Sequence, residues 1–208
     1  MNEKIDFVII WVEGGDADWR QEKNKYAGLP KEEINGDARF RDWDNLIYWF
    51  RGVEKFAPWV GNIYFVTCGH YPKWLNLNHP KLKFVRHDEY IPKEYLPTFS
   101  SHTIELNLHR IKGLSEKIVY FNDDMFLISP VQKSDFFENE KPRYVLQHEV
   151  FVPNQDNDFF QHIIINNMTI INKYFDKSTS IKKNFGKWFS FKNTFKYNAK
   201  NILLLPWK

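Results

Sequence analysis

The stretch of residues 5–12, with the sequence IDFVIIWV, limits the fold of this chain more than any other feature. Seven of its eight residues are apolar, whereas a strand with one face in solvent alternates apolar and polar residues. A continuous run of this kind is typical of a strand that is buried on both faces, as in a parallel sheet with helices on either side. We therefore expect the chain to contain such a sheet.

Further apolar segments alternate with helical patterns along the chain. Strands are predicted at residues 63–68, 82–85 and 118–121, and helices at residues 17–26, from Asp42 to just before Pro58, and from Ser100 or Ser101 to Gly113. The second helix has the apolar stripe Leu46, Trp49, Phe50, Val53 and Phe56, and the third has the stripe Ile104, Leu108 and Ile111. This alternation predicts an α/β fold with a mostly parallel, doubly wound sheet. After Met125 the pattern is less regular, with a strand expected near residues 144–147 and a helix near residues 160–175.

Composition excludes several classes of protein. A chain of 208 residues suits one domain, and the single cysteine, Cys68, rules out an internal disulfide or a multi-cysteine metal site. We interpret Cys68 as a packing residue at a strand end. No apolar run is long enough to cross a bilayer and no signal-peptide pattern is present, so we expect a cytoplasmic protein. Aromatic residues make up 18% of the chain, which fits a carbohydrate-related protein without proving it.

The charge is unevenly distributed. Residues 173–208 form a basic, aromatic tail with nine lysines and one acid, Asp176, so residues 1–172 carry 20 basic and 25 acidic groups, a net charge of −5. The tail suits peripheral contact with an anionic membrane surface, or it is a solvated lysine-rich face. Nucleic acid is not an expected partner, because the rest of the chain would repel phosphates.

Ligands of open parallel sheets bind beyond the carboxyl ends of the strands. The first strand ends in a turn with Glu13, Gly14, Gly15 and Asp16. Glycines there let backbone amides approach a phosphate closely, although an ordinary tight turn has the same composition. The fourth strand ends in Asn122, Asp123 and Asp124. Adjacent carboxylates can hold Mg²⁺ together with substrate phosphates, or they can cap the next turn.

Two other sets of residues are candidates for binding or catalysis. Arg39 and Arg41 precede the helix that Asp42 is expected to cap, and arginines near a helix N-terminus attract phosphate; ion pairs with nearby aspartates are the alternative. In the helix after Ser101, His102 and Glu105 lie on one polar face together with His109. A His-Glu pair there can act as acid or base or bind a metal, or it can simply form part of a solvent-exposed face.

Several segments of the sequence resemble those of a known protein family. Residues 5–16 (IDFVIIWVEGGD) resemble the opening block of the Stealth family, and the segments FRDWDNLIYWFRGVEKFAPWVGNIYFVTCGHYPKWL and LPTFSSHTIELNLHRIKGLSEKIVYFNDDMF resemble its second block; together the likeness covers residues 5–130. The resemblance implies a Rossmann-like fold related to nucleotide-sugar transferases. It also implies transfer of a sugar 1-phosphate from a nucleotide diphosphate sugar, UDP-linked, to the hydroxyl of a saccharide acceptor in capsular polysaccharide synthesis.

Carried over by position, the resemblance assigns roles to individual residues. It implies catalytic roles for Asp16, His102 and Arg110, and a divalent cation, Mg²⁺ or Mn²⁺, at Asp123 and Asp124. The residues that it places at the substrates are Trp11, Gly14, Arg39, Arg41, Asp42 and Asn45.

Some features depart from the family pattern. Glu13 stands where the family has Asp or Asn, Cys68 where it commonly has Asn or Asp, and His70 where it has Gln. The third and fourth blocks, which supply further catalytic His and Arg residues, are not recognised. We therefore expect residues 1–208 to be one α/β domain, incomplete at its C-terminus, that binds its donor but turns it over slowly. The alternatives are a glycosyltransferase that releases UDP and an inactive remnant that only binds the nucleotide sugar.

Overall fold

The computed structural model describes residues 4–26, 42–144, 159–189 and 198–199 of the 208-residue chain. The chain divides into two compact units, Met1–Arg143 and Tyr144–Lys208. All four strands of the main sheet belong to the first unit. The expectation of a single domain over residues 1–208 stays a prediction. The strand expected near residues 144–147 lies, apart from Tyr144, outside the described residues.

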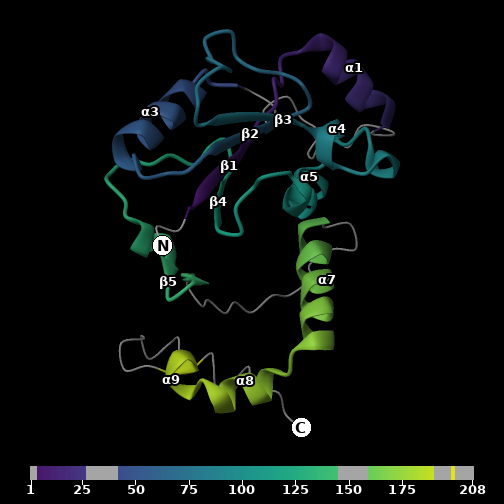
Figure 1. Cartoon of the computed structure of the whole chain (residues 1–208). Helices are drawn as coiled ribbons and strands as arrows, with labels where there is room; N and C mark the ends of the chain where they lie inside the picture. Colours follow the sequence, from purple (N-terminus) through teal and green to yellow (C-terminus); the bar gives the residue numbers. More distant parts are fainter. Residues whose placement is uncertain (1–3, 27–41, 145–158, 190–197, 200–208) are drawn as a thin grey trace. The chain divides into compact units, whose positions relative to one another are not determined.

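The main sheet has four parallel strands in the order β3-β2-β1-β4 (Figure 1). The strands are β1 (Asp6–Ile10), β2 (Ile63–Thr67), β3 (Leu82–Arg86) and β4 (Ile118–Phe121). The chain builds the sheet from β1 outward to β3, then returns to the other side of β1 to add β4, with Val8 of β1 paired to Tyr64 and Tyr120. The predicted α/β, Rossmann-like, doubly wound sheet is confirmed.

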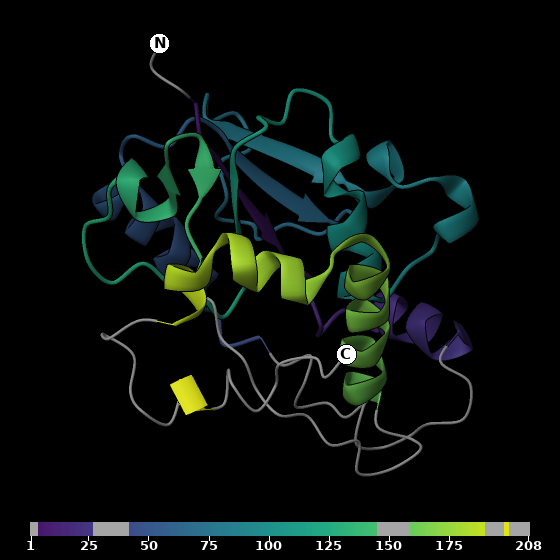
Figure 2. The same cartoon turned by 90° about the horizontal axis from the view of Figure 1, so that it is seen from below.

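Both faces of the sheet are covered by helices. Helix α3 (Leu46–Phe56) lies on one side of the strands, and α5 (Ser101–Asn107) lies on the other (Figures 1 and 2). Neighbouring residues of β1 point to opposite faces. Phe7 packs in the cluster that contains the α3 residues, whereas Val8 packs in the cluster that contains the α5 residues. This two-sided burial explains the unbroken apolar run in the sequence.

Helix α3 has the predicted buried stripe but begins later than predicted. Leu46, Trp49 and Val53 are buried, with Trp49 fully inaccessible to solvent. The prediction that Asp42 caps this helix is wrong, because Asn45 occupies the N-cap position. Asp42 Oδ1 instead accepts a hydrogen bond of 2.8 Å from the backbone N–H of Asp44. Aspartate side chains often favour such local turns over helix continuation.

Shorter elements complete the first unit. They are α1 (Ala17–Tyr26), α4 (His87–Tyr90), the 3₁₀ helices η2 (Lys93–Tyr95) and η3 (Leu108–Arg110), α6 (Lys133–Phe136), and the antiparallel pair β5 (Phe137–Glu138) and β6 (Lys141–Pro142). Helix α1 has the predicted bounds. Ser100 occupies the N-cap position of α5, as predicted, but its side chain makes no capping hydrogen bond. After η3, Gly113 adopts a φ of 78°, a conformation that glycine tolerates without strain.

Within residues 159–189, the second unit contains three helices. They are α7 (Phe159–Tyr174), α8 (Lys177–Lys183) and α9 (Phe185–Trp188). Helix α7 confirms the helix predicted near residues 160–175. Asp176 caps α8, because its Oδ1 accepts a hydrogen bond of 2.6 Å from the Thr179 N–H. Among the described residues, no helix combines the length and the hydropathy that crossing a bilayer requires.

Candidate functional site

A cleft of about 380 Å³ opens beyond the carboxyl ends of the parallel strands, and we call it the strand-end cleft. Residues that follow each of the four strands contribute to it, as the strand-end rule for open α/β sheets predicts. Its described lining residues are Ile10, Trp11, Val12, Trp19, Cys68, His87, Thr98, Phe99, Ser101, Ile104, Asn122, Asp123 and Asp124. The cleft therefore joins segments that lie far apart in the sequence.

The acidic end of the cleft is formed by Asp123 and Asp124, directly after β4. Desolvation by the surrounding walls raises the pKa of the Asp123 carboxyl, and the negative charges of Asp124 and Asp42 raise it further. The residue keeps part of its surface exposed, so its carboxylate stays within reach of a ligand. Two adjacent carboxylates fit a divalent cation that takes its remaining ligands from a substrate and water. Within residues 4–26, 42–144, 159–189 and 198–199, no cluster of three or more His, Cys, Asp and Glu side chains is arranged to hold a metal by itself.

Asn122 is held in place by the neighbouring strand and helix. The Tyr120 hydroxyl lies 2.8 Å from Asn122 Oδ1 and 3.1 Å from Glu105 Oε1, and can donate its proton to either oxygen. Burial, followed by the charge of Glu105, raises the pKa of Tyr120 above its ordinary value, so the hydroxyl remains a donor at neutral pH. Glu105, for which the sequence left an acid–base, a metal-binding and a solvent-exposed role open, therefore lies beside a residue of the cleft.

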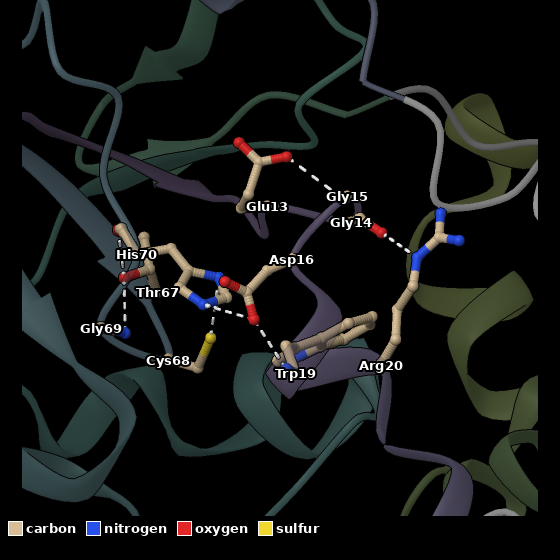
Figure 3. A network of polar contacts seen from close by, with 10 residues as sticks. All are labelled: Glu13, Gly14, Gly15, Asp16, Trp19, Arg20, Thr67, Cys68, Gly69 and His70. Carbon is tan, nitrogen blue, oxygen red and sulfur yellow. Dashed lines mark hydrogen bonds and ion pairs between the residues drawn. The ribbon is translucent and has the colours of Figure 1, made fainter. Parts of the chain in front are cut away.

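The turn after β1 is stabilised by its own polar groups (Figure 3). Glu13 Oε1 accepts a hydrogen bond of 3.2 Å from the Gly15 N–H, and the Glu13 carbonyl accepts one of 3.1 Å from the Asp16 N–H. Asp16 Oδ1 in turn accepts a hydrogen bond of 2.7 Å from the Trp19 N–H and caps α1. These contacts match the tight-turn interpretation of the glycines, and phosphate binding by this turn stays a prediction.

Cys68 and His70 approach this turn from the end of β2 (Figure 3). Cys68 Sγ lies 3.5 Å from His70 Nδ1, and His70 Nε2 lies 3.9 Å from Asp16 Oδ1. Burial raises the pKa of the Cys68 thiol, which keeps it protonated and makes it a poor nucleophile. Cys68 also contributes to the lining of the cleft.

His87 is the residue of the cleft that sequence reasoning missed most clearly. It follows β3 as the first residue of α4 and is only 9% exposed. Burial lowers the pKa of its imidazole to about 4, although the nearby Asp88 acts in the opposite direction. Trp19 and Phe99, also missed, form part of the same wall, with ring centroids 5.6 Å apart. The available signal was position alone: His87 comes two residues after the end of the strand predicted at residues 82–85.

The predicted site residues divide into five groups. Trp11, Asp123 and Asp124 line the strand-end cleft, whereas Gly14 and Asp16 belong to the adjoining turn, where the Gly14 carbonyl accepts a hydrogen bond from Arg20 Nε. Asp42 lies close enough for its charge to act on Asp123, and Asn45 is the N-cap of α3. His102 and Arg110 are exposed and are not among the described lining residues. Arg39 and Arg41 lie outside the described residues.

Comparison with known proteins matches residues 39–145 to the Stealth protein conserved region 2. The chain belongs to the Stealth family. It is 47% identical over 207 residues to the capsular polysaccharide phosphotransferase WcwK of Streptococcus pneumoniae, covering 99% of this chain and 61% of that protein. It is 48% identical to the capsular polysaccharide phosphotransferase eps5J of Streptococcus thermophilus, covering 90% of this chain and 79% of the relative. It is 46% identical to the receptor polysaccharide phosphotransferase WefC of Streptococcus gordonii, covering 98% of this chain and 61% of that protein.

The Stealth conserved region and the cleft overlap extensively. Residues 39–145 include β2, β3, β4 and α5, and therefore Cys68, His87 and the acidic pair. The residues contributed by β1 and α1 precede this region. The chain spans 61% and 57% of the length of two relatives named capsular polysaccharide phosphotransferase WcwK.

Proposed function

We propose that this Stealth chain forms the donor-binding part of a phosphotransferase that moves a sugar 1-phosphate from a nucleotide diphosphate sugar to a sugar hydroxyl of a surface or capsular polysaccharide. The observation that carries the proposal is the strand-end cleft, with Asp123 and Asp124 at the end of β4. The printed names of the relatives, capsular and receptor polysaccharide phosphotransferases, support the reaction class and the acceptor. We propose UDP as the nucleotide part of the donor.

The reaction mainly requires positioning and compensation of charge, because phosphoryl transfer passes through a loose transition state with little covalent assistance from the enzyme. Asp123 and Asp124 are the residues proposed to hold Mg²⁺ or Mn²⁺. When bound, the cation would neutralise negative charge on the phosphates. The Tyr120 hydroxyl, which also contacts Glu105, positions Asn122 beside these carboxylates.

The remaining assignments are proposals that the family resemblance supports. His102 is proposed as the base that accepts the proton of the acceptor hydroxyl; it is exposed and follows the cleft residue Ser101 on α5. Arg110, Arg39 and Arg41 are proposed to stabilise phosphate charge. Trp11 and the turn with Gly14 and Asp16 are proposed to contact the donor, because they lie on or beside the cleft.

The nucleotide that is released tests the proposed reaction. The chain is incubated with a panel of UDP-sugars, Mg²⁺ or Mn²⁺ and an oligosaccharide acceptor, and the products are separated by chromatography. Release of UMP together with a phosphate-linked product supports phosphotransfer, whereas release of UDP identifies a glycosyltransferase. Binding of the donor without release of either nucleotide is the outcome for a donor-binding part that needs further residues for turnover as well as for a binding module, and absence of donor binding contradicts the proposed site.

We also propose a cytoplasmic location with peripheral membrane contact, and the basic helices of the second unit support that contact. Helix α8 contains Lys182 and Lys183, and α9 exposes Phe185 beside Lys187. Lysines with an exposed aromatic ring suit an anionic lipid surface. Sedimentation with vesicles of phosphatidylglycerol, compared with vesicles of phosphatidylcholine, tests this contact. Equal binding to both kinds of vesicle would contradict it.

A further inference from the structure

Trp43 is an exposed aromatic residue near the acidic end of the strand-end cleft. It exposes 71% of its surface, the largest fraction of any tryptophan that the structure describes, whereas Trp11 and Trp19 of the cleft are buried. It directly follows Asp42, whose charge acts on the Asp123 carboxyl. Trp43 therefore lies near the proposed cation site without belonging to the described lining of the cleft.

A second exposed apolar residue, Met125, follows the acidic pair and is 52% exposed. The chain after it runs along α3. The Leu127 carbonyl lies against Gly52, where an added Cβ would be 2.9 Å from the oxygen. Further along both segments, the Val131 N–H donates a hydrogen bond of 3.0 Å to the Phe56 carbonyl. The two segments thus run in the same direction, so Met125 and the exposed tryptophan before α3 both lie toward the N-terminal end of that helix.

The charges around this apolar surface limit what can bind to it. Asp42 and Asp44 flank Trp43 in the sequence, and the acidic pair precedes Met125. These carboxylates repel phosphate groups that are not paired with a cation, and they repel the headgroups of anionic lipids. A neutral ligand with hydroxyl groups is not repelled, and its hydroxyls can donate hydrogen bonds to the carboxylate oxygens.

A sugar ring has both properties that this surface requires. One face of a pyranose presents C–H groups, which leave water when they stack on an aromatic side chain. Its hydroxyl groups project from the edge of the ring and can reach polar side chains nearby. Small-molecule sites commonly pair an aromatic surface with a few polar groups that fix the orientation of the ligand. A saccharide therefore fits Trp43 and its flanking aspartates.

The position favours the acceptor over the donor. The proposed function places the phosphates of the donor at a cation held by Asp123 and Asp124, and the reacting hydroxyl of the acceptor must approach those phosphates. An acceptor with several sugar units extends from that point beyond the cleft. Its neighbouring units then meet residues outside the described lining, and Trp43 is such a residue.

We infer that Trp43 is the stacking platform for a sugar unit of the acceptor saccharide, next to the unit that reacts. The inference rests on the proposed function, since it needs a donor bound at the acidic pair. Asp42 Oδ1 accepts a hydrogen bond of 2.8 Å from the Asp44 N–H, which restrains the backbone on both sides of Trp43. A platform that is already restrained loses less conformational freedom when the ligand binds.

Saturation-transfer NMR with neutral tetrasaccharides tests the inference. Cellotetraose, maltotetraose and lacto-N-tetraose are titrated, in the presence of UDP and Mg²⁺, into the wild-type chain and into Trp43→Ala and Trp43→Phe. Trp74→Ala is the matched control, because Trp74 is also exposed but lines a different hollow that shares no described lining residue with the cleft. Calorimetry measures the affinity for UDP with Mg²⁺ in each protein. Trp43→Gln replaces Trp43→Ala if that variant does not fold.

We expect at least one tetrasaccharide to bind the wild type, with the strongest saturation on the C–H protons of one ring face. Trp43→Ala should lower the affinity for that probe by about tenfold, because the stacked apolar surface is lost. Trp43→Phe keeps an aromatic ring and should lose less. Trp74→Ala should bind the probe as the wild type does, and Trp43→Ala should keep the wild-type affinity for UDP.

The outcomes separate the inference from the proposed function. If UDP binds but no tetrasaccharide does, or if Trp43→Ala binds the probe as tightly as the wild type, the inference is wrong and the proposed function stands. A loss of UDP affinity as large as the loss of probe affinity would place Trp43 at the donor and would also overturn the inference. If the wild type does not bind UDP, the proposed function fails, and the assignment of Trp43 to an acceptor fails with it.

Discussion

Two hollows of similar volume lie on the first unit and differ in chemistry. The strand-end cleft measures about 380 Å³, and a second hollow beside α3, which we call the side pocket, measures about 400 Å³. The side pocket is lined by Phe50, Val53, Glu54, Ala57, Pro58, Val60, Ile63, Trp74, Leu75, Asn76, His79, Lys81 and Leu82. Most of these residues belong to α3 and to the segments on either side of β2, away from the carboxyl ends of the strands.

The difference shows that position in the fold, and not volume, separates a candidate site from a packing gap. In the side pocket the polar groups lie at the rim, where Lys81 Nζ donates a hydrogen bond of 2.9 Å to the Pro58 carbonyl. In the strand-end cleft, Asp123 has a raised pKa and His87 has a buried nitrogen without a described partner. Such perturbed groups cluster at functional sites.

The largest expected effect concerns the core beside the side pocket. Trp49→Ala should lower the free energy of unfolding by about 3–5 kcal/mol, the usual cost of truncating a buried aromatic residue. Trp49 packs edge to face on Phe50 and Phe121, with centroids 5.0 and 5.4 Å away. Chemical denaturation measures the loss, with the exposed Tyr48→Ala as the control. A Trp49→Ala protein with wild-type stability but without nucleotide binding would show that this face of α3 is part of the site.

A second effect is a pH dependence of the stability that His87 contributes. The pKa of His87 falls from 6.5 in the unfolded chain to about 4 in the fold because of burial. Its contribution to stability is therefore fully present above pH 6.5 and is lost as the pH falls toward 4. The loss should be on the order of 2 kcal/mol by about pH 4.5.

Denaturation at several pH values measures this contribution. The His87→Gln protein should lose less stability than the wild type between pH 6.5 and 4.5, because the amide does not titrate. His79→Gln makes the same chemical change at an exposed residue of the side pocket and is the matched control. Identical pH profiles for His87→Gln and the wild type would mean that His87 is protonated without cost in the fold.

The third prediction concerns the binding of the nucleotide and the cation. Asp123→Asn and Asp124→Asn should each weaken Mg²⁺-dependent UDP binding by about 100-fold, because each removes a charged ligand from the proposed cation site. Neither change should lower the melting temperature, and Asp123→Asn should raise it slightly at pH 7, because the raised pKa shows that the fold disfavours this charge. Glu54→Gln makes the same chemical change in the side pocket and should leave affinity unaltered. Unchanged affinity in both aspartate variants would leave only a turn-capping role for them.

The smallest expected effect is that of a supporting hydroxyl. Tyr120→Phe removes the group that contacts both Glu105 and Asn122. It should cost about 0.5–1.5 kcal/mol of stability, the typical net value of a hydrogen bond, and should reduce UDP affinity by less than tenfold. Calorimetry and denaturation compare it with the exposed Tyr48→Phe. A reduction in UDP affinity as large as that of Asp123→Asn would mean that Tyr120 contacts the ligand directly.

Much of the fold could be predicted from the sequence, because burial leaves a local pattern. The run at residues 5–12 predicted β1, and the bounds of α1 and β4 agree with the prediction residue by residue. The stripe of α3 was also predicted, since helical periodicity records which face is buried. The start of α3 was not predicted correctly. Asp42 can cap a helix or close a local turn, and the sequence does not show which hydrogen bond forms.

The sequence by itself also determined the acidic end of the site, because the strand-end rule needs only the order of strands and the residues that follow them. Only the tertiary structure decided the rest of the cleft. His87, Phe99 and Trp19 come from three separate connections, and no periodicity links them. Their convergence depends on the parallel packing of β3, β2, β1 and β4 and on the path of the segment before α5. The burial that lowers the pKa of His87 is likewise a property of the packed surroundings, which a residue acquires only when the chain is folded.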